Sequence, residues 1–103
     1  MAAELTVIRW RDIPAQVVAR SGRERASVQL SDRFQEAIDM AATRIGLIGA
    51  DDYVGEWHRD SRPCGDDLEA EAQAEAARLE SAFGPDVLEV LAASGGVGGA
   101  GVA

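Results

Sequence analysis

The first thirty positions of the chain contain short runs rich in apolar residues, and one of these runs alternates regularly with polar residues. In residues 25–30, alanine, valine and leucine occupy the even positions and polar side chains occupy the odd ones. A period of two is typical of a strand with one solvent-exposed face. Residues 4–11 and 15–20 are rich in β-branched and apolar side chains and predict two further strands. Pro14 cannot donate to a sheet ladder, so we expect it at a strand edge or at the start of the second strand.

Beyond residue 31 the apolar spacing changes to three and four, which is the period of an amphipathic helix. One stripe predicts a helix over about residues 32–47, and a second stripe predicts a helix over about residues 67–83, ended by a Gly-Pro pair. The two stripes consist of Phe34, Ala37, Ile38, Ala41, Ile45 and Ile48, and of Leu68, Ala72, Ala76, Leu79 and Phe83. The exposed face of the second helix is expected to carry Glu69, Glu71, Glu75 and Glu80.

The segment between these helices has a weaker pattern. We expect an edge strand over residues 53–59 and a loop over residues 61–65, because Pro63 and Gly65 interrupt regular structure. An aspartate pair at residues 51–52 is equally suited to cap a single helical turn.

The remaining C-terminal residues separate into a short helical turn and a tail. Residues 86–93 predict the turn, and the glycine-rich residues 94–103 predict a disordered or extended tail. The chain is therefore expected to form one α+β domain over residues 1–93. Its predicted architecture is a small antiparallel sheet of three to four strands packed on one face by two helices, a two-layer sandwich.

Charge and composition narrow the classes of function. The 103 residues carry a formal net charge of −8, which disfavours binding to nucleic acid or to anionic membranes. All ten basic residues are arginines, so Schiff-base chemistry and a Walker-type phosphate loop are excluded. No apolar run reaches the roughly 18 residues of a membrane span, and no secretory signal is visible. We expect a cytoplasmic protein.

The single cysteine and the single histidine are the first candidates for chemistry. Cys64 precedes a predicted helix, whose N-terminal N–H groups would lower the pKa of a thiol, although Asp66 and Asp67 oppose this effect. His58 lies six residues upstream, with Asp60 on the same face of the expected strand. One Cys and one His are too few for a structural zinc site, so we expect neither a metal nor a bound cofactor.

The large aromatic residues outside the helices are the second candidates. Trp10, Tyr53 and Trp57, together with Arg11, are of the types enriched in interface hot spots and predict an interaction patch. The alternative is that both tryptophans cap the core of a small domain. Further arginines near the first two turns are expected to form a solvated face, with recognition of an anionic or acidic partner as the alternative.

Two segments carry a resemblance to a known family. They are Trp10-Arg11-Asp12-Ile13-Pro14-Ala15-Gln16-Val17 and Phe34-Gln35-Glu36-Ala37-Ile38-Asp39. With weaker support at Tyr53, Trp57 and residues 65–69, the chain resembles a small bacterial virulence-factor family that includes the N-terminal domain of staphylococcal virulence factor C. The resemblance implies no catalytic residue. Stand-alone members look like neighbours of folate- and corrinoid-dependent methyl-transfer genes, which implies an accessory role in one-carbon metabolism.

Three functions are consistent with these patterns. The first is a non-catalytic interaction module that binds a larger protein, such as a folate- or corrinoid-dependent one-carbon enzyme. The second is a thiol-dependent enzyme or redox sensor that uses Cys64 with His58. The third is a self-associating subunit in which an exposed strand edge pairs with a second copy.

Overall fold

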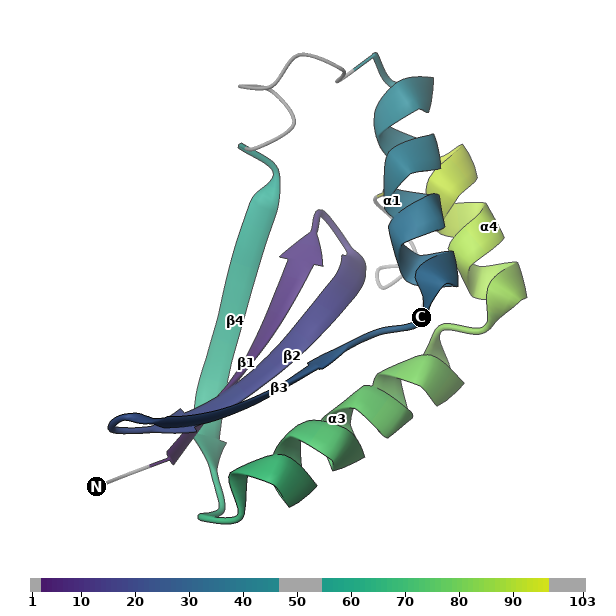
Figure 1. The fold of residues 1–103 in the computed structure, drawn as a ribbon. Helices are drawn as coiled ribbons and strands as arrows, with labels where there is room; N and C mark the ends of the chain where they lie inside the picture. Colours follow the sequence, from purple (N-terminus) through teal and green to yellow (C-terminus); the bar gives the residue numbers. More distant parts are fainter. Residues whose placement is uncertain (1–2, 47–54, 97–103) are drawn as a thin grey trace.

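The computed structural model describes residues 3–46 and 55–96, which form four strands and three helices (Figure 1). In chain order the elements are β1 (Ala3–Trp10), β2 (Ile13–Ser21), β3 (Glu24–Gln29), α1 (Asp32–Arg44), β4 (Trp57–Cys64), α3 (Leu68–Ala82) and α4 (Pro85–Ala93). The predicted α+β class with two layers is confirmed. Within the described residues a third helix adds to the two that were expected, because residues 85–93 form a full helix in place of a short turn.

The four strands form one antiparallel sheet in the order β3-β2-β1-β4. A two-residue turn at Arg11 and Asp12 joins β1 to β2, so that Trp10 pairs with Ile13. The register then shifts by one residue, because Ile8 and Arg9 pair with Gln16 and Pro14 and leave one extra residue in β2. This bulge bends the sheet next to its first turn.

Strand β4 differs most from the expectation. It begins at Trp57 and continues through Pro63 to Cys64, where a loop was expected. Pro63 pairs with Glu4 at the edge of the sheet, a position where the missing N–H of a proline is tolerated. Residues 47–54, including the first part of the predicted strand, lie outside the described residues.

The helices bury the predicted stripes. Phe34, Ile38 and Ala41 of α1 are buried, although this helix ends at Arg44 and Ile45 is partly exposed. In α3, Ala72, Ala76 and Leu79 are buried, as expected. The added helix α4 buries Leu88, Leu91 and Ala92. Each helix therefore uses one apolar side to reach the core, as an amphipathic helix does.

The helices divide into two groups around the sheet (Figure 1). Helix α3 packs across β2 and β3 and touches β1 less extensively. Helices α1 and α4 lie side by side near the β1–β2 turn. One cluster of buried side chains joins both groups to the sheet, with Trp10 and Ile13 at the turn and Leu5 and Val17 farther along the strands. Strand β4 is the part of the sheet with the least helical cover.

The first three residues of the expected tail belong to the fold. After α4, Gly95 N–H donates to Ala92 O at 3.3 Å and Gly96 N–H donates to Leu91 O at 2.7 Å. This pair of bonds is a Schellman motif, in which Gly95 has the positive φ that the motif needs, +75°, and the following Gly96 has φ of +90°. Both glycines are buried. Residues 97–103 lie outside the described residues.

The β1–β2 turn forms hydrogen bonds with this C-terminal motif. Asp12 N–H donates to Gly96 O at 2.8 Å, and a guanidinium N–H of Arg11 donates to Gly95 O at 3.2 Å. Arg11 also binds Glu56 through its backbone N–H and its Nε, and its guanidinium lies 5.5 Å from the centroid of Trp10. Arg11 has φ of +52°, an uncommon backbone conformation for a side-chain-bearing residue. These contacts hold that conformation in place.

Candidate functional site

The structure separates the residues of the predicted aromatic patch. Trp10 is completely buried, with a relative exposure of 0%, so the prediction that its ring contacts a partner is wrong. The turn that follows α4 contributes to this burial, because Gly96 lies against the ring. Arg11 is half-buried and its guanidinium is engaged within the domain. Tyr53 lies outside the described residues.

Trp57 is half-buried and lines a surface hollow. The hollow encloses about 380 Å³. Its lining is polar for the most part and consists of Ile8, Ala15, Gln16, Gln29, Gln35, Trp57, His58 and Arg59. We call it the Trp57 hollow. An aromatic ring beside carboxamides and a guanidinium is a combination that suits recognition of a polar partner surface.

A row of paired residues across all four strands forms the floor of the Trp57 hollow. Gln29 of β3 pairs with Gln16 of β2, Gln16 pairs with Ile8 of β1, and Ile8 pairs with Arg59 of β4. Directly paired residues point to the same side of a sheet. Within residues 3–46 and 55–96, the side chains of Gln16, Gln29 and Arg59 have no hydrogen-bond or ion-pair partner. The hollow therefore offers unused donors and acceptors.

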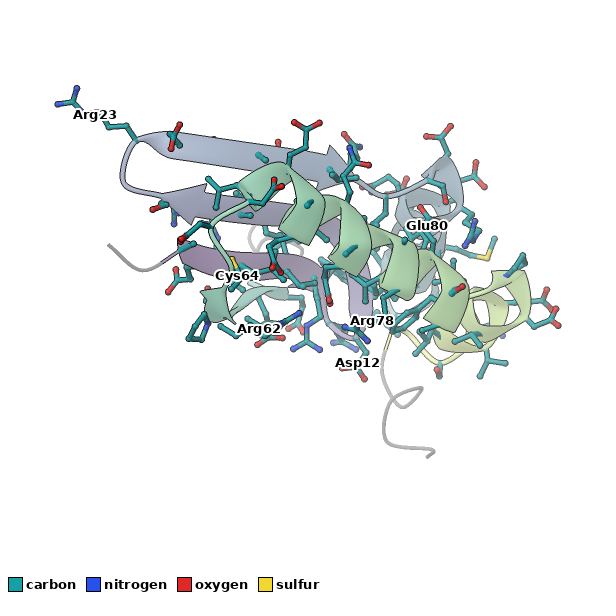
Figure 2. The ribbon with its side chains drawn as sticks, turned by 90° about the horizontal axis from the view of Figure 1, so that it is seen from below. Asp12, Arg23, Arg62, Cys64, Arg78 and Glu80 are labelled. Carbon is teal, nitrogen blue, oxygen red and sulfur yellow. The ribbon has the colours of Figure 1, made fainter. Side chains whose placement is uncertain are left out.

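A second hollow lies between α3 and the β1–β4 side of the sheet. It encloses about 310 Å³ and we call it the α3 groove. Its lining combines apolar side chains with three arginines and three acids: Leu5, Val7, Pro14, Leu79, Phe83, Arg9, Arg62, Arg78, Asp12, Asp60 and Glu75, with Ser61 at the strand. Figure 2 shows Arg62 and Arg78 on one side of α3 and Glu80 on the other.

Glu75 is the central charged group of the α3 groove. Its side chain is only 5% exposed, yet both of its carboxylate oxygens bind guanidinium groups. Arg62 donates to Oε1 at 2.9 Å, and Arg78 donates to both oxygens in a bidentate pair. The hydrogen bonds from Arg78, together with the charges of both arginines, lower the pKa of Glu75 although burial opposes that shift.

The expected exposure of Glu75 is wrong, and the sequence contains a signal for its burial. Glu75 lies three residues after Ala72 and four before Leu79, so it falls on the buried side of α3. A carboxylate on an apolar stripe requires a partner, and Arg78 stands three residues away on the same helix. Glu80 is half-exposed and binds Arg33 and the backbone and hydroxyl of Ser31.

The thiol site expected from the sequence is not assembled. Cys64 and His58 lie six residues apart on the single extended strand β4, which separates them by about 20 Å at roughly 3.3 Å per residue. Burial, followed by the negative charges of Glu71, Asp66 and Glu4, raises the pKa of the Cys64 thiol, while Arg62 lowers it to a lesser extent. The thiolate that nucleophilic chemistry needs is therefore disfavoured.

The carboxylate expected to act with His58 has a different partner. Asp60, expected as the partner of His58, forms an ion pair with Arg9. In the ranges that the structure covers, no cluster of three or more His, Cys, Asp and Glu side chains is suited to hold a metal ion. Among the same residues, no helix has the length and apolar character needed to cross a membrane.

Comparison with known proteins places the chain in a family. The family model described as virulence factor matches residues 8–92, which include β2, β3, β4, α1, α3 and all but the last residue of α4. The chain belongs to this virulence factor family. Searches of curated proteins and of solved structures gave no match. The match spans the whole lining of the Trp57 hollow and all of the α3 groove except Leu5 and Val7.

Proposed function

We propose that this virulence factor family protein is a non-catalytic binding module that docks onto a larger protein through the Trp57 hollow. The observation that carries the proposal is the row of Gln29, Gln16 and Arg59 beside the half-buried Trp57 ring. Tryptophan and arginine dominate the energetics of protein interfaces. The unpartnered amides supply directional hydrogen bonds for specificity.

The partner that we propose is a one-carbon or methyl-transfer enzyme that depends on folate or corrinoid. This part of the proposal rests on family resemblance and not on a residue of the site. The acidic character of the chain, with a net charge of −8, supports a protein partner over a nucleic acid. Arg59 is positioned to meet a carboxylate of that partner.

Co-purification tests the proposal. The tagged chain is recovered from its host at native level, stoichiometric partners are identified by mass spectrometry, and binding is then measured with the purified partner. Trp57→Ala and Arg59→Gln should each weaken binding at least tenfold, while Arg23→Gln at the distant β2–β3 turn should not (Figure 2). Unchanged affinity in both hollow variants would contradict the proposed surface.

Self-association through β4 is a separate candidate. Strand β4 forms an edge of the sheet, and an edge presents unpaired backbone groups to a second strand. Pro63 and the charged residues of β4 are of the types that natural edges use to discourage such pairing. Sedimentation at micromolar concentration distinguishes the two functions, because a dimer that persists in the Trp57→Ala variant would favour self-association through the edge strand β4.

A further inference from the structure

The α3 groove contains an arrangement that packing alone does not require. Glu75 is 95% buried and faces the groove, where an apolar residue would avoid the cost of desolvating a carboxylate. Its negative charge is matched by two guanidinium groups, so this cluster of three side chains has a net charge of +1. The side chains of Arg62 and Arg78 are nonetheless 57% and 64% exposed. Glu75 therefore holds two accessible cations against the wall of the groove.

The guanidinium groups in the groove have N–H donors to spare. Arg62 uses one terminal nitrogen and Arg78 uses Nε and one terminal nitrogen to bind Glu75. Among the described residues neither arginine has another hydrogen-bond acceptor. Arg9 lines the same groove, but its guanidinium is paired with Asp60. The accessible donors of the groove are therefore those of Arg62 and Arg78.

The apolar floor determines what kind of acceptor fits. Leu5, Val7, Pro14, Leu79 and Phe83 line the groove below the arginines. A volume of about 310 Å³ suits a small organic molecule, at the lower end of common ligand sites. Inorganic phosphate alone would leave this floor uncovered, whereas an apolar chain or ring attached to the anion would cover it.

The arginines orient such a ligand. Asp60 is paired with Arg9, whereas Arg62 and Arg78 keep N–H donors that Glu75 does not use. The anion therefore belongs toward Arg62 and Arg78, and the apolar body extends toward Phe83. We propose that the α3 groove binds a small amphiphilic organic anion, with its carboxylate on Arg62 and Arg78 and its apolar body on Leu79 and Phe83.

The test uses octanoate as the probe and the intact chain labelled for NMR. Octanoate should shift the amide signals of β4 and α3 around Arg62 and Leu79, in a saturable manner. Arg62→Gln and Arg78→Gln should each weaken binding at least tenfold, because each removes a charge-assisted hydrogen bond. The matched control is Arg23→Gln at the β2–β3 turn, which Figure 2 shows projecting away from α3, and it should bind like the wild type.

Two further probes separate the contributions of charge and apolar body. 1-Octanol, which lacks the charge, should bind more weakly and should be insensitive to Arg62→Gln. Inorganic phosphate should bind more weakly than octanoate. Phosphate binding as tight as octanoate would overturn the amphiphilic class. Octanoate shifts centred on the exposed Met40, Val87 and Val90 would overturn the site, as would unaltered octanoate affinity in folded Arg78→Gln.

Discussion

Gly96 lies directly against the indole of Trp10. A Cβ atom on Gly96 would stand 3.0 Å from Cζ3 and 3.3 Å from Cε3 of that ring. The residue also has φ of +90°, a backbone conformation that L side chains rarely adopt. Near the end of α4, a glycine that looks like part of a low-complexity tail is therefore a fitted component of the core.

The Gly96→Ala variant should be less stable than the wild type by about 1–3 kcal/mol, because it introduces both backbone strain and a close contact with a buried ring. Urea unfolding followed by tryptophan fluorescence measures the change. The control is Gly84→Ala, since a Cβ there meets nothing within 4 Å. Gly84 is the N-cap of α4, so a small loss is expected from the poorer cap. Equal losses in the two variants would contradict the proposed fit.

Removal of residues 95–103 should lower the melting temperature, contrary to the expectation for a simple tail. This deletion removes the bonds from Asp12 N–H to Gly96 O and from Arg11 to Gly95 O, and it exposes Trp10. A chain that ends after Gly96 keeps these contacts and is the matched variant for comparison. Differential scanning calorimetry of the two truncations gives the contribution of the turn itself. Coincident melting curves would show that the turn adds no stability.

Replacement of each tryptophan by alanine should have a different effect on stability. Trp10→Ala should destabilise the domain by about 3–5 kcal/mol, because a fully buried aromatic ring is lost. Trp57→Ala should cost less, since Trp57 is only half-buried. Urea unfolding at equal ionic strength compares them. If partner binding is lost in Trp10→Ala but not in Trp57→Ala, the loss reflects unfolding of the domain and not the removal of a contact with the partner.

The Cys64 thiol should react slowly with iodoacetamide at neutral pH. Its pKa is raised by burial and by Glu71, Asp66 and Glu4, so the thiolate forms at higher pH than for a free cysteine. Glu71→Gln should lower the pKa of Cys64, and Arg62→Gln should raise it. The pH dependence of the alkylation rate measures all three values. A wild-type midpoint below about 8.5 would revive the thiol-based function.

Glu75 should make stability depend on acid. Its pKa is lowered in the folded protein, chiefly by its hydrogen bond with Arg78. The unfolded chain therefore takes up a proton first as the pH falls, and the stability contributed by Glu75 is complete above about pH 4.5 and is lost below it.

The Glu75→Gln variant should be less stable than the wild type at pH 7 by roughly 1.5–3 kcal/mol, as for other hydrogen bonds to charged groups. This difference should narrow as the pH falls below about 4. Urea unfolding between pH 7 and pH 2.5 measures this difference in stability. The control is Glu69→Gln, because Glu69 is an exposed residue of the same helix. A difference that is constant with pH would contradict the assignment.

Local patterns were sufficient to predict the first three strands, the apolar stripes of α1 and α3, and the two-layer class. They predicted an edge strand over residues 53–59, which is confirmed from Trp57 to Arg59, but they missed its continuation to Cys64, because the run from Trp57 to Cys64 is mostly exposed and has no apolar alternation. An edge strand is selected by the backbone groups of its neighbour, here β1, and no property of its own side chains reveals that neighbour.

The candidate sites were less predictable than the fold. The burial of Trp10 depends on Gly95 and Gly96, which lie more than eighty positions away in the chain. The ion pair between Glu75 of α3 and Arg62 of β4 depends on how these two elements pack, so the sequence alone does not show it. The signal available beforehand was the position of Glu75 on an apolar stripe. For such a residue, its position in the helical period predicts burial better than its charge does.

The hydrogen bond from Arg11 to Gly95 spans 84 positions of the sequence, and β1 pairs along its length with β4. Contacts between distant parts of a chain require the entropy of large loops to be lost before their enthalpy is gained. Domains built in this way fold more slowly than helical bundles of similar size. The hairpin of β1 and β2 brings together only local residues. We therefore expect closure of the domain to follow the arrival of β4 and of the turn after α4, so that the joining of β1 with these later segments is a late step of folding.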